Sequence, residues 1–358
     1  MDQILLFCRP GFETEAGREL TDTAGNLGIF GYFEPVKGQG LVWFSLTTPA
    51  TSDLLMQRLP LEKLVFTRDW FVVVGRFPLP DKDRVGAVID AIRELDCDFP
   101  ECARLEVRLP ENNSDRDLGN FARKWVSPLS RGLRDTGFLM KAPDAQADAR
   151  FEILVPDFSV VVIGYSLRKN RARFVGGIPR LRLPASAPSR SALKLEEAWK
   201  VFLPPAQELD YLGGGKKAAD LGAAPGGWTW QLVRQGMMVT AVDNGPMNED
   251  LMASGHVEHV RADGYLWRPR RGIDWMVCDI VDQPRKTAKL AVDWLANGHC
   301  KYTIFNLKLP MKKRYDEWLI CRDMIESGLA EAGVGYQLRA RHLYHDREEI
   351  TCFIERTG

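Results

Sequence analysis

One segment constrains the fold of this chain more than any other. It runs from Asp220 to Trp228 with the sequence DLGAAPGGW, after a strand-like run and before a helix-like run. Small residues let a ligand approach the backbone, and paired glycines permit tight turn geometry. The segment has neither the GxGxxG pattern nor the Lys-Ser/Thr pair of a P-loop. It predicts a tight strand-to-helix turn, and glycines alone do not decide whether that turn binds a ligand.

The pattern around this turn predicts a doubly wound α/β fold in the second half of the chain. Helix-like stretches, notably 229–234 and 285–296, separate several strand-like runs. Those runs are Ala218–Leu221, Val239–Val242, Val257–Val260, Trp275–Cys278 and Thr303–Leu307. Such folds are usually built on a parallel sheet, and their ligand crevice lies at the carboxyl ends of the strands.

Acidic side chains close three of these strands. Asp243 closes the second strand, about 20 residues after the glycine turn, where a carboxylate accepts the two hydroxyls of a ribose. Asp263 closes the third strand, where an adenine amino group needs an acceptor, and Asp279 closes the fourth. Any one of them could be an ordinary helix N-cap. Because all would face one crevice, the set favours a nucleoside-containing cofactor.

The first half of the chain predicts an α+β organisation with short connections. Helical spacing marks 12–24, 84–95 and 117–133, the last with an interruption at Pro128. The final two strands are expected to form a hairpin around Pro156-Asp157. The strand-like runs are Ile4–Cys8, Leu41–Ser45, Val65–Gly75, Leu105–Leu109, Phe151–Val155 and Ser159–Ser166.

Composition narrows the class of protein. The 358 residues suggest two or three domains, and 45% hydrophobic residues suffice for ordinary cores. The 48 Lys+Arg cancel the 48 Asp+Glu, which excludes a chain that is basic throughout but not a local basic face. No apolar run approaches the roughly 18 residues of a membrane span, and the N-terminus has no signal-peptide pattern. We therefore expect a cytoplasmic protein without membrane contact.

The thiols and histidines predict no disulfide framework and no metal site. The seven cysteines are odd in number and no pair has CxxC spacing. His342 and His345 would share a face only on a helix, but their surroundings are typical of a strand and a turn. The cysteines, expected to be reduced and partly buried, are Cys8, Cys97, Cys102, Cys278, Cys300, Cys321 and Cys352.

The strongest charge asymmetry lies between Arg168 and Lys200. This stretch has nine Lys/Arg and only two acidic residues, Glu196 and Glu197. Its cations alternate with Phe174, glycines and prolines. It is either a solvated linker or a segment that lies along a polyanion, and its spacing favours contact with RNA.

Residues 220–228 resemble motif I of the FtsJ-like S-adenosylmethionine-dependent RNA 2′-O-methyltransferases. The resemblance extends over the whole chain to bacterial members that methylate a ribose of 23S rRNA, and the matching segments are long and specific. Besides motif I, they are Cys8–Glu13, Gly177–Leu181, Ala187–Ser191, Leu193–Ala198, Val242–Met247, Ile304–Arg314 and Leu343–Glu349.

The resemblance implies a Rossmann-like methyltransferase domain preceded by α+β ferredoxin-like and THUMP units. The expected bounds are 1–90 for the ferredoxin-like unit, 91–170 for the THUMP RNA-binding unit, 171–186 for a basic proline-containing linker and 187–358 for the catalytic domain. The implied methyl donor is S-adenosylmethionine. The implied substrate is one cytidine in the peptidyl-transferase region of 23S rRNA, modified before the large subunit is complete. A monomer is expected.

FtsJ-like enzymes use a Lys-Asp-Lys-Glu tetrad, which the resemblance maps onto Lys194, Asp279, Lys308 and Glu349. A ribose hydroxyl is a poor nucleophile, so a base must accept its proton. A lysine can do this only when neutral, and burial or a neighbouring cation favours that form. We expect Lys308 to be the base, Lys194 to be the neighbouring cation and the two acids to orient the lysines. This chemistry requires no metal.

Two sets of binding residues are predicted. The cofactor-binding set lies at the glycine turn, the strand ends and the start of the lysine-bearing helix. It comprises Ser191, Gly222, Ala224, Pro225, Gly226, Gly227, Trp228, Asp243, Asp263 and Asp279. The RNA-binding set is basic. It comprises Arg171, Arg173, Arg180, Arg182, Arg190, Lys312, Lys313 and Arg314.

Three other functions make different demands on the sequence. A THUMP-bearing base N-methyltransferase usually carries an Asn/Asp-Pro-Pro-Tyr/Phe motif after the fourth strand, where residues 279–282 read DIVD. A non-enzymatic RNA-binding or assembly protein on this fold predicts a broken tetrad or a blocked glycine turn. A nicotinamide dehydrogenase predicts GxGxxG and a hydride-handling His or Tyr. The sequence favours the 2′-O-methyltransferase over all three.

Overall fold

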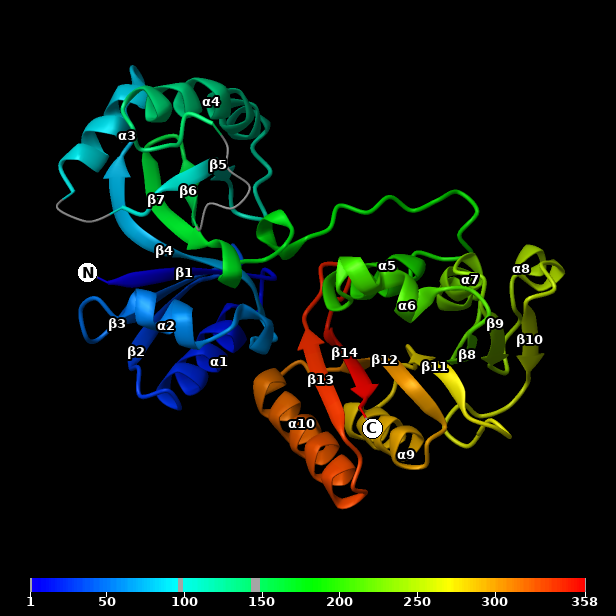
Figure 1. The fold of residues 1–358 in the computed structure, drawn as a ribbon. Helices are drawn as coiled ribbons and strands as arrows, with labels where there is room; N and C mark the ends of the chain where they lie inside the picture. Colours follow the sequence, from blue (N-terminus) through cyan, green and yellow to red (C-terminus); the bar gives the residue numbers. More distant parts are fainter. Residues whose placement is uncertain (1, 96–98, 143–148, 358) are drawn as a thin grey trace. The chain divides into compact units, whose positions relative to one another are not determined.

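The computed structural model describes residues 2–95, 99–142 and 149–357. The chain forms two compact units, Met1–Gly177 and Ile178–Gly358 (Figure 1). No helix in the described part of the chain is long and apolar enough to cross a membrane. Six cysteines are buried free thiols, and Cys97 lies outside the described residues.

The first unit is built on one sheet with the strand order β2-β3-β1-β4-β7-β6-β5. Among the described strands of this sheet, only the β5–β6 pair is parallel, and β6 and β7 form the expected hairpin. The sequence pattern did not indicate β2, because that strand contains Gly31 and Pro35 and has no buried residue. The strands are β1 (Gln3–Cys8), β2 (Gly31–Val36), β3 (Leu41–Leu46), β4 (Thr67–Pro78), β5 (Cys102–Arg108), β6 (Ala149–Asp157) and β7 (Val160–Leu167).

The longest strand, β4, joins the two parts of this sheet. Its residues 67–73 pair with β1, and its residues 72–78 pair with β7 across an irregularity at Val73–Gly75. Helix α1 packs on β2 and β3, whereas α4 packs on α3 and β5. The helices are α1 (Glu13–Gly25), α2 (Ser52–Arg58), α3 (Arg84–Arg93) and α4 (Arg116–Asp135), with short 3-10 turns at Leu61–Lys63, Arg168–Asn170 and Val175–Gly177.

The expected interruption at Pro128 is wrong. Helix α4 runs without a break from Arg116 to Asp135, with Pro128 inside it. A proline removes one intrahelical hydrogen bond and usually kinks or ends a helix. Here Pro128 and Lys124, whose carbonyl loses its partner, are both exposed, so water can satisfy that carbonyl. The opposite face of α4 buries Leu118, Trp125 and Leu129, which keeps the helix on the sheet.

The second unit confirms the predicted α/β class. Its sheet has the strand order β10-β9-β8-β11-β12-β14-β13. The five strands from β10 to β12 run parallel, and β14 is antiparallel to both of its neighbours. The strands are β8 (Lys217–Leu221), β9 (Met238–Val242), β10 (Val257–Val260), β11 (Ile273–Cys278), β12 (Cys300–Lys308), β13 (Tyr336–Arg341) and β14 (Glu349–Arg356).

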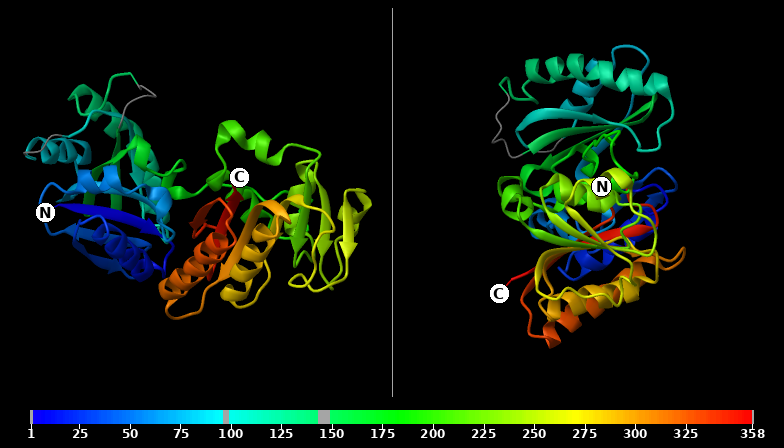
Figure 2. Two further views of the ribbon diagram at one scale, coloured as in Figure 1. Left: turned by 60° about the horizontal axis from the view of Figure 1, so that its bottom comes forward. Right: turned by 90° about the vertical axis from the view of Figure 1, so that its right-hand side faces the viewer.

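Helices cover both faces of this sheet (Figures 1 and 2). On one face, Leu195, Trp199 and Phe202 of α5 join a core with Trp275 and Phe353 of the sheet. On the other face, α9 packs on β12 and on α10. The helices are α5 (Ala192–Phe202), α6 (Glu208–Leu212), α7 (Gly227–Arg234), α8 (Glu249–Ala253), α9 (Pro284–Ala296) and α10 (Arg314–Glu331), with a 3-10 turn at Pro205–Gln207.

Candidate active site

The glycine turn connects β8 to α7 at the carboxyl edge of the parallel sheet. Gly222 and Gly226 have φ angles of +79° and +113°, which side-chain-bearing residues rarely adopt. The Ala224–Pro225 peptide is cis. Trp228, in the predicted cofactor-binding set, is buried in the core, so only its backbone is available to a ligand.

Gly227 brings the start of α7 against the start of α5. A Cβ at Gly227 would lie 2.2 Å from Ser191 Oγ and 2.4 Å from Ser189 Oγ. The two hydroxyls are themselves 2.6 Å apart. The glycine therefore permits a close contact between the turn and the helix that carries Lys194.

Asp243 follows β9 and ties the turn to the neighbouring strand. Its Oδ2 accepts the Ala224 N–H at 3.1 Å, and its Oδ1 accepts the Gly245 N–H at 2.7 Å. The side chain is half-buried. Each carboxylate oxygen has a second lone pair, so Asp243 can still accept hydrogen bonds from a ligand.

Two other aspartates near the glycine turn differ in burial. Asp263 is exposed, and its Oδ1 accepts the Tyr265 N–H at 2.8 Å. Asp220 is fully buried beneath the turn, where Thr229 Oγ1 donates to it at 2.6 Å. Burial raises the pKa of Asp220 to about 7, against the opposing effect of the Thr229 hydrogen bonds. Asp263 is therefore open to a ligand, whereas Asp220 supports the turn from below.

The four residues of the predicted tetrad lie in mutual contact. Lys194 Nζ is 2.6 Å from Glu349 Oε1 and 3.1 Å from Asp279 Oδ2. Lys308 Nζ is 2.5 Å from Asp279 Oδ1 and 3.7 Å from Glu349 Oε1. Four separate segments meet here: the first turn of α5, the end of β11, the last residue of β12 and the first residue of β14.

Burial and neighbouring charges shift the pKa values of this tetrad in opposite directions. Burial lowers the pKa of Lys194, but the carboxylates of Asp279 and Glu349 outweigh it and the pKa is raised. Burial likewise raises the pKa of Asp279, but Lys308 and Lys194 outweigh it and the pKa is lowered. Lys194 therefore stays protonated and Asp279 stays ionised at neutral pH.

Three residues behind the tetrad were missed by sequence reasoning. Asn306 Nδ2 donates to Asp279 Oδ1 at 2.8 Å, and Thr351 Oγ1 lies 2.8 Å from Asn306 Oδ1 and 3.0 Å from both oxygens of Asp346. Strand alternation carried a signal for two of them. Asn306 precedes Lys308 by two positions on β12, and Thr351 follows Glu349 by two on β14, so each pair shares a face.

The loop after β13 is fixed by a buried carboxylate. Glu197 of α5 accepts the Tyr344 and His345 N–H groups at 2.7 and 2.8 Å. Glu197 has no exposed surface. This loop leads into Glu349, so α5 positions Lys194 directly and Glu349 through the loop.

The basic residues predicted to bind RNA differ in their surroundings. Arg171 is half-buried, and burial lowers its pKa. Arg314 forms an ion pair with Glu348 at 2.7 Å. The others are exposed: Arg173, Arg180, Arg182, Arg190, Lys312 and Lys313.

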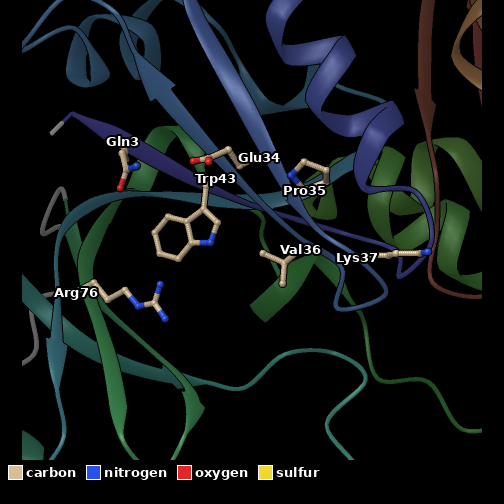
Figure 3. A pocket seen from close by; sticks show the side chains of 7 residues that line it. All are labelled: Gln3, Glu34, Pro35, Val36, Lys37, Trp43 and Arg76. Carbon is tan, nitrogen blue, oxygen red and sulfur yellow. The ribbon is translucent and has the colours of Figure 1, made fainter.

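A cavity of about 470 Å³ lies on the sheet of the first unit (Figure 3). The half-buried ring of Trp43 lies between Gln3 and Arg76 in this view. Lys37 and Arg76 are exposed cations at its margin. The other lining residues are Glu34, Pro35 and Val36. No tetrad residue lines this cavity, so it is distinct from the candidate active site.

Three family models match successive parts of the chain. The RlmM ferredoxin-like domain matches residues 1–71, and the N-terminal model of ribosomal RNA large subunit methyltransferase M matches 83–167. The FtsJ-like methyltransferase model matches 187–307, which contains the glycine turn, Lys194 and Asp279. Fold and match together define a methyltransferase that uses S-adenosylmethionine.

Full-length relatives narrow the class. A protein of Marinobacter nauticus named "Ribosomal RNA large subunit methyltransferase M" is 68% identical over 99% of both chains. A protein of the same name from Pseudoalteromonas translucida is 42% identical over 100% of this chain and 98% of its own. This chain belongs to the ribosomal RNA large subunit methyltransferase M family. Among solved structures, the match to TrmN from Thermus thermophilus covers 100% of both chains at 14% identity with a TM-score of 0.38.

Proposed function

We propose that this protein methylates the ribose 2′-hydroxyl of a cytidine in the peptidyl-transferase region of 23S rRNA, before the large subunit is complete. The observation that carries the proposal is the contact of Lys194, Asp279, Lys308 and Glu349 at the sheet edge that holds the glycine turn. The names of the relatives support an rRNA substrate.

The crevice offers S-adenosylmethionine suitable partners. Asp243 would accept the ribose hydroxyls, and the exposed Asp263 would accept an adenine amino group. The ionised Asp279 favours a positively charged sulfonium nearby. The cofactor supplies a methyl group on a sulfur that leaves readily.

Lys308 is the better candidate for the base of the two lysines. Lys194 has two carboxylates within 3.1 Å and a raised pKa, so it holds its proton. Lys308 contacts Asp279 closely and Glu349 only at 3.7 Å. After losing its own proton, Lys308 Nζ would accept the hydroxyl proton as the oxygen attacks, while the protonated Lys194 keeps Asp279 and Glu349 in place.

Two surfaces would hold the RNA. Exposed cations such as Arg180 and Lys312 suit phosphate contacts, which position RNA without reading its sequence. The cavity at Trp43, with Arg76 and Lys37 beside it, suits an unpaired base that stacks on the indole. We assign residues 91–170 the RNA-binding role of a THUMP unit.

A pair of substitutions at Lys308 tests the proposed chemistry. Lys308→Ala should abolish methyl transfer and leave the affinity for S-adenosylmethionine near that of the wild type, because the role of this lysine is realised in the transition state. Lys308→Arg should be nearly as inactive, since arginine does not deprotonate. Single-turnover methylation of 23S rRNA and titration calorimetry measure the two properties. Lys301→Ala is the matched control, because Lys301 is an exposed lysine at the other end of the same strand. Substantial turnover by Lys308→Ala would point to another base.

A further inference from the structure

A chain of buried polar groups leads away from the tetrad. Asn306, Thr351 and Asp346 each have no exposed surface. Asn306 pairs with Thr351 across the antiparallel strands β12 and β14, and two positions along these strands Lys308 pairs with Glu349. The two pairs therefore share one face of the sheet. Asp346 lies in the loop before β14, and its Oδ2 accepts the Leu343 N–H at 2.9 Å. The order of contacts from the tetrad inward is Asp279, Asn306, Thr351, Asp346.

Counting hydrogens fixes the direction of each bond in this chain. Ionised Asp279 can only accept, so Asn306 must turn its amide NH₂ toward Asp279 and its carbonyl oxygen toward Thr351. Thr351 has a single hydroxyl hydrogen, and the Asn306 oxygen at 2.8 Å requires it. No hydrogen of Thr351 then remains for Asp346.

The contact between Thr351 and Asp346 therefore needs a hydrogen from Asp346. An ionised Asp346 would set its lone pairs against those of Thr351 at 3.0 Å in an interior without water access, which is unfavourable. A protonated Asp346 donates from Oδ1 to Thr351 Oγ1 and still accepts the Leu343 N–H at Oδ2. Every group in the chain is then satisfied.

The surroundings of Asp346 also favour its neutral form on balance. Burial raises the pKa of Asp346, and the carboxylates of Glu349 and Glu197 raise it further. The Leu343 N–H and the ammonium of Lys194 act against them. The pKa lies well above its ordinary value.

We propose that Asp346, held as a neutral carboxylic acid, and Thr351 are positioning residues for methyl transfer, acting on Asp279 through Asn306. In this chain of contacts Asp346 donates to Thr351, Thr351 donates to Asn306, and Asn306 donates to Asp279 Oδ1. Asp279 Oδ1 is the oxygen that also binds Lys308. The chain fixes the rotation of the Asp279 carboxylate and thereby the place of the Lys308 ammonium. This inference rests on the proposed role of the tetrad.

The first test replaces the carboxylic acid with its uncharged analogue. Asp346→Asn can donate from its NH₂ to Thr351 and accept from Leu343 N–H, so it should keep kcat within about threefold of the wild type. Asp346→Leu cannot do either and should lower kcat by at least about tenfold, the scale of a lost buried hydrogen bond. An Asp346→Asn variant as impaired as Asp346→Leu would overturn the proposal.

The second test separates positioning from folding. Thr351→Val should lower kcat by about tenfold or more with KM values for both substrates nearly unchanged, and Thr351→Ser should restore kcat. Thr303→Val is the matched control, because Thr303 is equally buried on β12 but its hydroxyl donates only to Met276 Sδ at 3.4 Å. Equal kcat values for Thr351→Val and Thr303→Val would remove Thr351 from the mechanism.

The third measurement does not depend on catalysis. Infrared spectra of the full chain at about pH 8, above the pKa of about 7 for Asp220, should show a carboxylic-acid carbonyl band that Asp346→Asn lacks. Identical spectra in this region would overturn the proposal. If the wild type shows the band, Asp346→Asn lacks it and Lys308→Ala is fully active, the neutral Asp346 would stand and only the role of Lys308 as the base would be overturned.

Discussion

At Asp279, one carboxylate serves two lysines that are not equivalent. Lys194 contacts Asp279 and Glu349 within 3.1 Å, whereas Lys308 contacts Asp279 and has only a longer contact of 3.7 Å to Glu349. The side chains of Lys194 and Lys308 are 18% and 16% exposed, so neither is fully buried and their exposure is nearly equal. The difference between the lysines therefore comes from their partners and not from their burial.

Asp243 should be the main anchor for the cofactor. Asp243→Ala should weaken S-adenosylmethionine binding by about 1–3 kcal/mol, the scale of a lost charge-assisted hydrogen bond. Titration calorimetry gives this difference. Asp274→Ala is the control, since Asp274 also accepts a backbone N–H, from Lys217, but lies on β11 near its amino end. An unchanged affinity in Asp243→Ala would remove Asp243 from the site.

Asp220 should make stability depend on pH. Its pKa is raised from 3.8 to about 7, so between these values the folded state holds a proton that the unfolded chain has released. The contribution of Asp220 to stability is therefore fully present below about pH 4 and is lost as pH rises through about 7, by an order of a few kcal/mol. Asp220→Asn should flatten this part of the curve, measured by urea unfolding at several pH values. Asp274→Asn serves as the control, and equal pH slopes in the wild type and Asp220→Asn would contradict the assignment.

Sequence reasoning placed the residues that directly follow a strand, and it missed those whose contacts depend on how two strands pair. Asp243 and Asp279 could be placed because each directly follows a strand. Asn306 and Thr351 could not be joined, because their contact depends on β14 inserting beside β12 in a particular register. Asp346 required the loop conformation as well. The positions at the strand ends could be predicted from the sequence, but the hydrogen bonds behind them could not.

At the scale of elements, the junction of α5 and α7 couples the glycine turn to the tetrad. The first turn of α5 carries Lys194, and α7 begins at Gly227. The two helices pack against each other, and α5 also contacts β14, which carries Glu349. A displacement at this junction would therefore reach both a lysine and a carboxylate of the tetrad.

Gly227→Ala should separate these two helices. The added Cβ would clash with Ser191 Oγ and Ser189 Oγ, so the variant should lose about 1–3 kcal/mol of stability by overpacking. It should also lose more than tenfold in methylation rate as Lys194 moves. Thermal unfolding and single-turnover assays measure the two effects.

A glycine in an open position provides the control. Gly119 lies inside α4, and no neighbouring segment of the described chain comes within 4 Å of the place that a Cβ would take. Gly119→Ala should leave activity unchanged and gain about 0.5–1 kcal/mol, because alanine favours a helix. If Gly227→Ala were as active and stable as Gly119→Ala, the close contact at α5 would not matter for catalysis.

At the scale of the whole molecule, the glycine turn, the strand-end acids and the tetrad all belong to the second unit. A fragment of residues 187–358 should therefore fold and bind S-adenosylmethionine as the full chain does. It should methylate 23S rRNA at least about tenfold less efficiently, because the removed part would supply much of the grip on the RNA. Cofactor calorimetry, RNA affinity at two salt concentrations and methylation assays test this division.

The full chain allows a milder version of the same experiment. Trp43→Ala should weaken RNA binding by about 1–3 kcal/mol, the value of one stacked base, with cofactor affinity unchanged. Phe30→Ala is the control, since Phe30 is 64% exposed in the same unit and does not line the cavity. Full-efficiency methylation of the same nucleotide by fragment 187–358 would mean that the first unit does not recognise the substrate.

The pairing of β4 with both β1 and β7 affects how the first unit unfolds. Because β1 holds one end of this strand and β7 the other, neither part of the sheet can open without exposing an edge of the other. The two parts should then melt as one cooperative foldon, although separate family models match them. Amide hydrogens in the middle of β4 would exchange with solvent only when the entire unit unfolds.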